Sequence, residues 1–389
     1  MTRQVISTAA LLALGALAVG LGGCDSGSCE RSGLGCPATE PGDGPVVAGV
    51  DLGALFAAPR GEEIEAVLAG WQSAPDSAAR LREVAVVELG GRETVRVVEG
   101  LRPGLGVAFV GAVRQPPREP GDARQRPLLL VLGDGPDADV DELIRDLAVR
   151  EDLQDDVVMV FLAYRGGALR VGGRSFASAA PPDPYAADGE DAWALVTGLG
   201  GIVDDPTIDF DRLAIVGHGR GGNVALLEAA RARERGRGVP SYVLVLSAPS
   251  SFFTPTAQFS ARQALEGRPV GSLPAVGGVL EATALAVRDG ERSVAEARLG
   301  LLRRSGAFFF APPRLRAPPF LFAAVPGSNV VVPQEDARVL DFLSGAPDRG
   351  LYLELEGGTH ASVQSNGQVL STGAAYLCDL LLDGAPAEC

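Results

Sequence analysis

A glycine-rich turn at residues 217–221 is the first stretch of the sequence with the features of a chemical site. It reads Gly-His-Gly-Arg-Gly, follows the apolar run 212–216 and leads into a segment with helical spacing. In a strand, turn and helix of this kind, the backbone N–H groups at the helix start point at a ligand, and the central residue of the turn often carries a nucleophile. The central residue here is Gly219, which has no side chain. The turn therefore predicts a place for an anion or a carbonyl oxygen, but no covalent catalysis.

Two more polar residues lie just beyond apolar runs that read as strands. Asn329 follows one such run and His360 follows the next. His360 is one of only two histidines among 389 residues, and the other is His218 in the glycine-rich turn. Ligands of open parallel sheets bind at the carboxyl ends of the strands, so we expect Gly219, Asn329 and His360 to share one edge of a sheet.

The segments that must position these residues alternate between two patterns. Continuous apolar runs, typical of parallel strands covered on both faces, occur at 128–133, 157–164, 212–217, 242–247, 320–325 and 351–356. Amphipathic stretches between them predict helices, and the three β-rich runs 84–89, 93–98 and 106–113 predict an antiparallel meander ahead of the sheet. Helical patterns in residues 250–318 interrupt the alternation and predict a cap-like insertion between the strands ending at Ser247 and Val325. The pattern predicts an α/β domain over 50–389 with a mostly parallel, doubly wound sheet.

The three strand ends, in their order along the chain, resemble the α/β-hydrolase family. Its nucleophile elbow is G-x-S-x-G, and its triad runs nucleophile, acid, histidine. The resemblance covers most of residues 80–384 and implies an α/β-hydrolase fold. The segment AYRGGALRVGGRSF (163–176) looks like the motif that follows the fourth strand in the prolyl-oligopeptidase and dienelactone-hydrolase branch.

Carried over residue by residue, the resemblance implies a degenerate site. The nucleophile position falls on Gly219, where it is lost, and the acid position falls on Asn329, where it is altered; only the base position, His360, is retained. An oxyanion hole would use the backbone N–H of Arg220 and a second donor near Asp134, whose carboxylate brings a negative charge to the pocket. Asparagine at the acid position can hold a histidine ring but cannot offset its positive charge.

These departures predict a non-catalytic relative, a pseudo-hydrolase that binds a small acyl or peptide-like ligand or a protein partner. One alternative is an active esterase or peptidase that uses water activated by His360 or a displaced serine; the candidates are Ser247, Ser250, Ser251 and Ser328. A scaffold without a pocket is a third interpretation.

A nucleotide-binding interpretation of the same turn is weaker. Gly217, Gly219 and Gly222 match the dinucleotide fingerprint G-x-G-x-x-G. That fingerprint belongs to the first strand–helix unit, however, whereas this turn follows the third predicted parallel strand, and the next strand ends in Ser247 rather than an acidic residue. We expect no cofactor. A net charge of −15 and a pI near 4.7 also argue against a nucleic-acid partner.

The N-terminus predicts export and lipid anchoring. Residues 1–23 have a basic start, an apolar core and small residues directly before Cys24, as in a bacterial lipoprotein signal. This resemblance implies cleavage before Cys24, a lipid on its thiol, a flexible tether over 24–49, and a protein on the periplasmic side of a membrane whose identity stays open.

Four cysteines remain after lipidation, and an exported protein can keep disulfides. They are Cys29, Cys36, Cys378 and Cys389, and they allow two local pairs or links between the two ends of the chain. None neighbours a histidine at metal-ligand spacing, so we expect no metal site.

Overall fold

The computed structural model describes residues 45–73, 79–90, 93–116, 125–146, 155–203, 205, 207–270, 274–310, 320–324, 351–355, 360, 362–363 and 365–381. The predictions for the signal peptide, Cys24, Cys29, Cys36, Ser328, Asn329 and Cys389 lie outside these residues. Within them, no helix combines the length and the apolar character needed to span a membrane.

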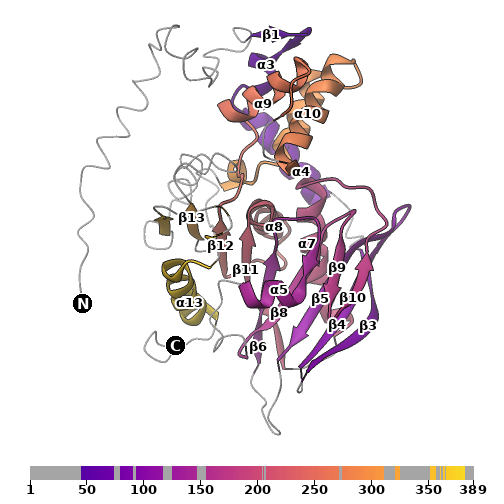
Figure 1. The fold of residues 1–389 in the computed structure, drawn as a ribbon, viewed down its shortest axis with the longest axis vertical. Coiled ribbons are helices and arrows are strands. Elements are labelled where there is room, and N and C mark those ends of the chain that lie inside the picture. The colour runs from indigo at the N-terminus through magenta and orange to yellow at the C-terminus, as the bar shows by residue number, and fades with distance from the viewer. Residues whose placement is uncertain are drawn as a thin grey trace, which may run out of the picture.

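A nine-stranded sheet forms the body of the molecule, with the strand order β14-β13-β12-β11-β6-β8-β5-β4-β3 (Figure 1). The strands are β3 (Arg80–Gly90), β4 (Glu93–Arg102), β5 (Gly106–Gln115), β6 (Arg126–Leu132), β8 (Val158–Ala163), β11 (Ile208–His218), β12 (Tyr242–Leu246), β13 (Phe320–Ala324) and β14 (Leu351–Glu354). The first three pair antiparallel, as the meander prediction requires, and β8, β6, β11, β12, β13 and β14 run parallel. The doubly wound, mostly parallel sheet expected from the apolar runs is confirmed.

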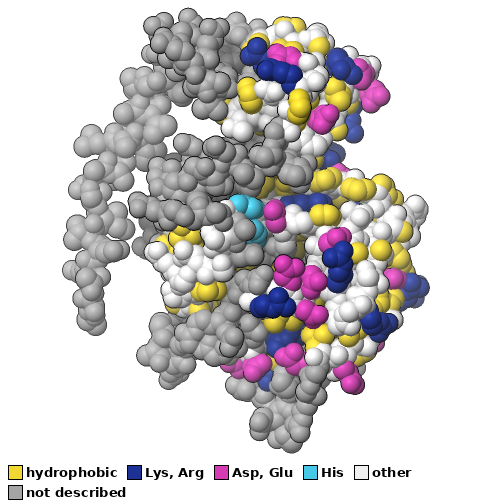
Figure 2. Space-filling model, viewed as in Figure 1, with side chains coloured by type: hydrophobic (Ala, Val, Ile, Leu, Met, Phe, Trp, Pro, Cys, Tyr) yellow, Lys and Arg dark blue, Asp and Glu magenta, His cyan; other side chains and the backbone are white. Residues whose placement is uncertain are grey.

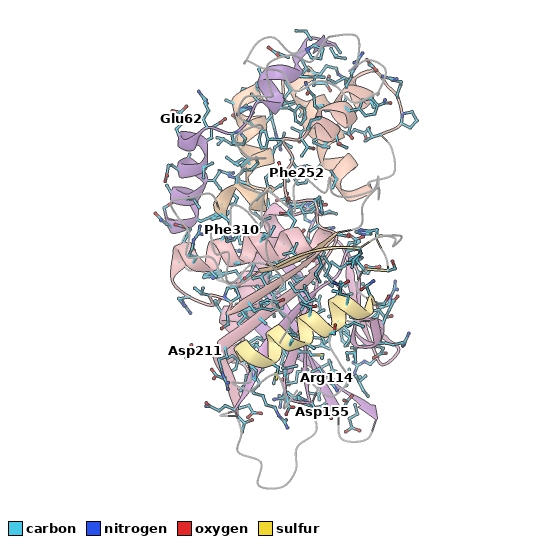
Figure 3. The ribbon with its side chains drawn as sticks, turned by 90° about the vertical axis from the view of Figure 1, so that its left-hand side faces the viewer. Glu62, Arg114, Asp155, Asp211, Phe252 and Phe310 are labelled. Carbon is cyan, nitrogen blue, oxygen red and sulfur yellow. The ribbon has the colours of Figure 1, made fainter. Side chains whose placement is uncertain are left out.

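Both faces of the sheet are covered, which explains why its strands are apolar without alternation. Leu128 and Leu130 of β6 pack into one buried cluster with helices α7 (Ala186–Gly198) and α8 (Arg220–Arg235). Leu129 and Val131 point the other way, into a second buried cluster. That second cluster lies under α5 (Val140–Asp146) and α13 (Gly367–Leu381), and α13 crosses the sheet in Figure 3.

The predicted insertion forms a helical cap above the sheet. It contains α9 (Pro255–Leu265), α10 (Pro274–Arg288), α11 (Val294–Leu302) and the 3₁₀ turn η2 (Gly306–Phe310). Phe310 is buried, and Phe309 packs on Trp71 of α4 (Gly61–Ser73) with ring centroids 4.5 Å apart. The aromatic run at the end of the insertion therefore belongs to the core between cap and body (Figure 3).

The N-terminal segment completes this cap, which the sequence did not predict. It begins with strands β1 (Val46–Val47) and β2 (Val50–Asp51) and helix α3 (Leu52–Phe56), which lie beside α9 and α10 in Figure 1. Arg298 of α11 pairs with Glu63 of α4 at 2.8 Å and donates to the carbonyl oxygens of Ala54 at 2.8 Å and Ala57 at 2.9 Å. One buried arginine thus connects the inserted helix α11 to the N-terminal segment of the cap.

Candidate functional site

The glycine-rich turn has the backbone of a nucleophile elbow. Gly219 joins β11 to α8 with φ +53° and ψ −117°, a conformation that L side chains rarely adopt. Its N–H donates to the carbonyl oxygen of Leu246 at 2.8 Å. Two positions later, a Cβ on Gly221 would lie 2.1 Å from the carbonyl oxygen of Leu132, so α8 can approach β6 this closely only with glycine there.

The side chain of Asp134 occupies the space in front of Gly219. Its Oδ1 accepts a hydrogen bond from the backbone N–H of Arg220 at 2.7 Å. A Cβ built on Gly219 would lie only 1.9 Å from the same oxygen. The carboxylate therefore stands where a nucleophile's side chain would begin, and it also uses the N–H that was expected to serve an oxyanion hole.

His360 lies at the same point, as predicted. Its Nε2 is 3.1 Å from Oδ2 of Asp134, so one carboxylate contacts both the helix start and the histidine. Its buried Nδ1 has no hydrogen-bond partner among the described residues. The pKa of Asp134 lies below its usual value: burial raises it, but the hydrogen bonds from His360 and Arg220 and the charges of His360 and His218 together outweigh the burial.

His218 joins this group, although the sequence did not predict it as a site residue. Its Nε2 donates to the backbone carbonyl of His360 at 2.8 Å, and the two imidazole rings stack with centroids 4.4 Å apart at 28°. Burial lowers the pKa of His218, and the neighbouring His360 lowers it further. Figure 2 shows both histidines (cyan) beside an acidic side chain (magenta). The clue in the sequence was that the only two histidines each follow a predicted strand at the same sheet edge.

The loop that carries Asp134 is held by the motif that follows β8. The hydroxyl of Tyr164 donates to the carbonyl of Gly133 at 3.0 Å, and the backbone N–H of Tyr164 donates to the carbonyl of Pro136 at 3.0 Å. Arg165 pairs with Asp191 of α7 at 2.6 Å and ties the motif to the helix layer. Tyr164 is therefore a positioning residue for Asp134.

The side chain of Arg220 is a buried ion-pair partner. Its Nε donates to Oδ2 of Asp188 at 2.8 Å, and its guanidinium lies 4.4 Å from the ring centroid of Tyr164. The N–H of Tyr185 donates to the same Asp188 oxygen at 2.6 Å. Burial raises the pKa of Asp188 to about 6, although the charge of Arg220 opposes this shift.

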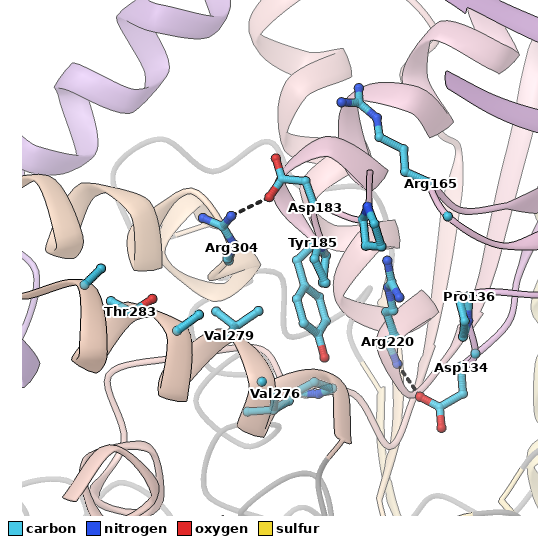
Figure 4. A pocket seen from close by; sticks show the side chains of 18 of the residues that line it. Asp134, Pro136, Arg165, Asp183, Tyr185, Arg220, Val276, Val279, Thr283 and Arg304 are labelled. Atoms are coloured by element: carbon cyan, nitrogen blue, oxygen red, sulfur yellow. Dashed lines mark hydrogen bonds and ion pairs between the residues drawn. The ribbon is translucent and has the colours of Figure 1, made fainter. Parts of the chain in front are cut away.

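A cavity of about 1080 Å³ lies between the cap and this site (Figure 4). Apolar residues of α10, among them Val276 and Val279, form one wall, while Asp134, Tyr185 and Arg220 lie on the opposite side. The cap therefore does not fill the cleft, which argues against a scaffold without a pocket.

Of the serines considered as displaced nucleophiles, the three that the structure describes do not line this cavity. Ser247 is buried with φ +43°, Ser250 is buried, and Ser251 accepts a hydrogen bond from the N–H of Phe253. These contacts suit turn and packing roles.

Comparisons with known proteins agree with this architecture. A family model described as alpha/beta hydrolase fold matches residues 178–296, which include the elbow. No curated protein matches the sequence. With the sheet order and the elbow geometry, the family match shows that the chain has an α/β-hydrolase fold.

Several solved esterases are similar in structure. An esterase of Pyrobaculum calidifontis in its monoclinic form is 18% identical, with 85% of this chain and 94% of that chain covered and a TM-score of 0.44. Acetyl xylan esterase 1 from Thermoanaerobacterium sp. JW/SL YS485 is 12% identical, with 78% and 89% covered and a TM-score of 0.49. Carboxyl esterase 2 from Tuber melanosporum is 12% identical, with 83% and 100% covered and a TM-score of 0.49.

Proposed function

We propose that this protein binds a small ligand in the cavity beneath its cap and forms no acyl-enzyme. The observation that carries the proposal is the carboxylate of Asp134 at the elbow. Gly219 supplies no attacking oxygen, and Asp134 Oδ1 already accepts the Arg220 N–H that would stabilise an oxyanion. Covalent acyl transfer needs both of these parts, and neither is available.

The walls of the cavity favour a ligand with one apolar and one polar end. Val276 and Val279 offer an apolar surface on the cap side, and Asp134 offers an accepting carboxylate on the body side. An ionised carboxylate attracts hydrogen-bond donors and cations and disfavours anions. A small acyl amide or peptide-like molecule, whose N–H group meets Asp134 and whose apolar part meets α10, fits this division.

The binding test uses simple acyl amides as probes and a blocked cavity as the comparison. Ala282 of α10 lines the cavity, whereas its exposed neighbour Glu281 is not among the lining residues. We expect calorimetry with short N-acyl amino-acid amides to show binding that Ala282→Trp removes and Glu281→Trp retains. Equal binding by both tryptophan variants would place the ligand elsewhere.

An active hydrolase is the second candidate, because the 3.1 Å contact between His360 and Asp134 resembles a base held by an acid. In that case His360 would take a proton from water without a covalent intermediate. We expect no hydrolysis of short acyl esters or aminoacyl amides by the purified protein above the rate of its His360→Ala variant. A rate that His360→Ala abolishes would reverse this ranking, and labelling of one serine by a fluorophosphonate would favour a displaced nucleophile.

We also infer that the protein works outside the cytoplasm on a lipid anchor. The apolar core of residues 1–23 and the small residues before Cys24 support this. Metabolic labelling with a radioactive fatty acid should mark the wild-type protein and not the Cys24→Ser variant. An unlabelled wild-type protein would contradict the anchor and would leave the cavity proposal untouched.

A further inference from the structure

We propose that Asp134, His218 and His360 form a binding site for a divalent transition-metal ion of the zinc type. Each residue offers one ligand atom, and these three atoms lie within 4.8 Å of one another. The sequence predicted no metal site because no cysteine has a histidine near it at metal-ligand spacing along the chain. This group contains no cysteine, and its members come together only in the folded protein.

The chemistry of the donors selects the class of ion. Two imidazoles and one carboxylate suit zinc and neighbouring transition metals, whereas magnesium and calcium prefer oxygen ligands alone. The chain has two histidines in total, and the fold stacks both at one acidic side chain.

The contact between His360 and Asp134 has the length of a metal chelate. Ligands that lie about 2.0–2.2 Å from a zinc ion are roughly 3–3.5 Å from each other. The Nε2 of His360 and Oδ2 of Asp134 are 3.1 Å apart. A metal ion can therefore take the place of the proton between these two atoms with little movement of either side chain.

The hydrogen bond of His218 is the kind that metal-bound histidines make. A carbonyl oxygen only accepts, so Nε2 of His218 carries the proton that it donates to the carbonyl of His360. In the neutral ring this leaves the lone pair on Nδ1. Donation from the second ring nitrogen to a backbone carbonyl is the usual way to orient a metal-binding histidine. The three donor atoms lie within 4.8 Å of one another, so the farthest of them need to approach by up to about 1–2 Å for all three to reach one ion.

The site keeps an open side toward the cavity. The side chain of Asp134 is 48% exposed and lines the cavity, while that of His360 is 16% exposed. Three protein ligands with an open position are the arrangement of metal sites that also bind a small molecule. The inference rests on the proposed function and deepens it: with the ion bound at Asp134, the amide would meet the metal with its carbonyl oxygen rather than meet the carboxylate with its N–H.

The test is titration of the metal-free protein, purified with a tag that contains no histidine. We expect calorimetry to show one equivalent of Zn²⁺ bound at micromolar or tighter affinity, with no heat from Mg²⁺. Co²⁺ should give a visible spectrum of a low-symmetry nitrogen and oxygen site without a thiolate charge-transfer band. His218→Gln, His360→Gln and Asp134→Asn should each weaken Zn²⁺ binding by more than the roughly 10- to 100-fold that loss of an outer-shell partner produces.

Asp183→Asn is the matched control, because Asp183 lines the same cavity but pairs with Arg304. It should bind Zn²⁺ like the wild type, and circular dichroism should show that all variants are folded. The inference is overturned if the wild type takes up no Zn²⁺, if both histidine variants keep wild-type affinity, or if a thiolate band appears with Co²⁺. If the wild type binds the acyl amides but no Zn²⁺, the proposed function stands and only the metal site is refuted. If it binds Zn²⁺ but no acyl amide, only the acyl-amide proposal is refuted.

Discussion

Two carboxylates, those of Asp134 and Asp188, accept hydrogen bonds from Arg220. They differ in their other partners, in their exposure and in the direction in which their pKa is shifted. Asp134 accepts the backbone N–H of Arg220, contacts His360 and has a side chain that is 48% exposed. Asp188 accepts from the guanidinium of Arg220 and is fully buried. The pKa of Asp134 lies below its usual value, whereas burial raises the pKa of Asp188 to about 6.

The difference separates a group that faces a ligand from one that supports the fold. Asp188 keeps the helix start in place through Arg220 and the N–H of Tyr185, in surroundings where its own charge is unfavourable. The charge of Asp134 is stabilised by two hydrogen-bond donors. Its side chain is half exposed, so the carboxylate can also contact a ligand in the cavity. Substitutions at Asp188 should therefore act on stability, and substitutions at Asp134 should act on binding.

The largest effect is expected from Asp188→Ala. It removes the only carboxylate that bonds the buried guanidinium of Arg220 among the described contacts, and it leaves the Tyr185 N–H without its acceptor. Removal of one member of a buried pair costs about 3–5 kcal/mol, and we expect a loss of about 4 kcal/mol in urea unfolding at pH 7. Asp188→Asn keeps an accepting oxygen and the volume, so its loss should be less than half as large. Equal losses for the two variants would show that the charge, not the hydrogen bonds, stabilises the helix start.

The pH dependence of stability gives the next largest effect. The pKa of Asp188 is about 6 in the folded protein and about 3.9 in an unfolded chain, so the folded state binds a proton more tightly. The stabilisation from this proton is complete below about pH 4 and is lost as the pH rises through 6. A shift of about two pKa units corresponds to about 3 kcal/mol. The free energy of unfolding of the wild type, measured relative to Asp188→Asn, should fall by about 3 kcal/mol between about pH 3 and pH 7.5, and a constant or rising difference would contradict the assignment.

The fold was open to prediction because local patterns determine it. The apolar runs that become β6, β8, β11 and β12 are long, and the glycines of the elbow are required by a positive φ and a close helix approach. The positions of Gly219 and His360 at one sheet edge followed from the same patterns, as did the helical insertion. The predictions for Asn329 and for the pairing of the cysteines remain predictions.

The sequence could not predict that the Asp134 carboxylate fills the space in front of Gly219, because this depends on contacts between residues far apart along the chain. Asp134 and Arg220 are 86 residues apart, and His218 and His360 are 142 apart. The sequence placed a negative charge near the pocket, but only the folded loop turns it onto the Arg220 N–H. The docking of α3 on the cap has the same origin, since it depends on Arg298 reaching carbonyl oxygens more than 240 residues away.

The smallest effect tests whether Asp134 truly occupies the space of the missing side chain. Gly219→Ala should lower the free energy of unfolding by about 2 kcal/mol, since the new Cβ adopts a strained φ and displaces the Asp134 carboxylate from the Arg220 N–H. In an Asp134→Gly background only the strain remains, so the same change should cost about 1 kcal/mol. The difference of about 1 kcal/mol is the coupling free energy between the side chains at positions 134 and 219, and a double-mutant cycle of urea unfolding measures it. Additive effects would mean that Asp134 and a side chain at position 219 can coexist, in which case the elbow would again have room for a nucleophile.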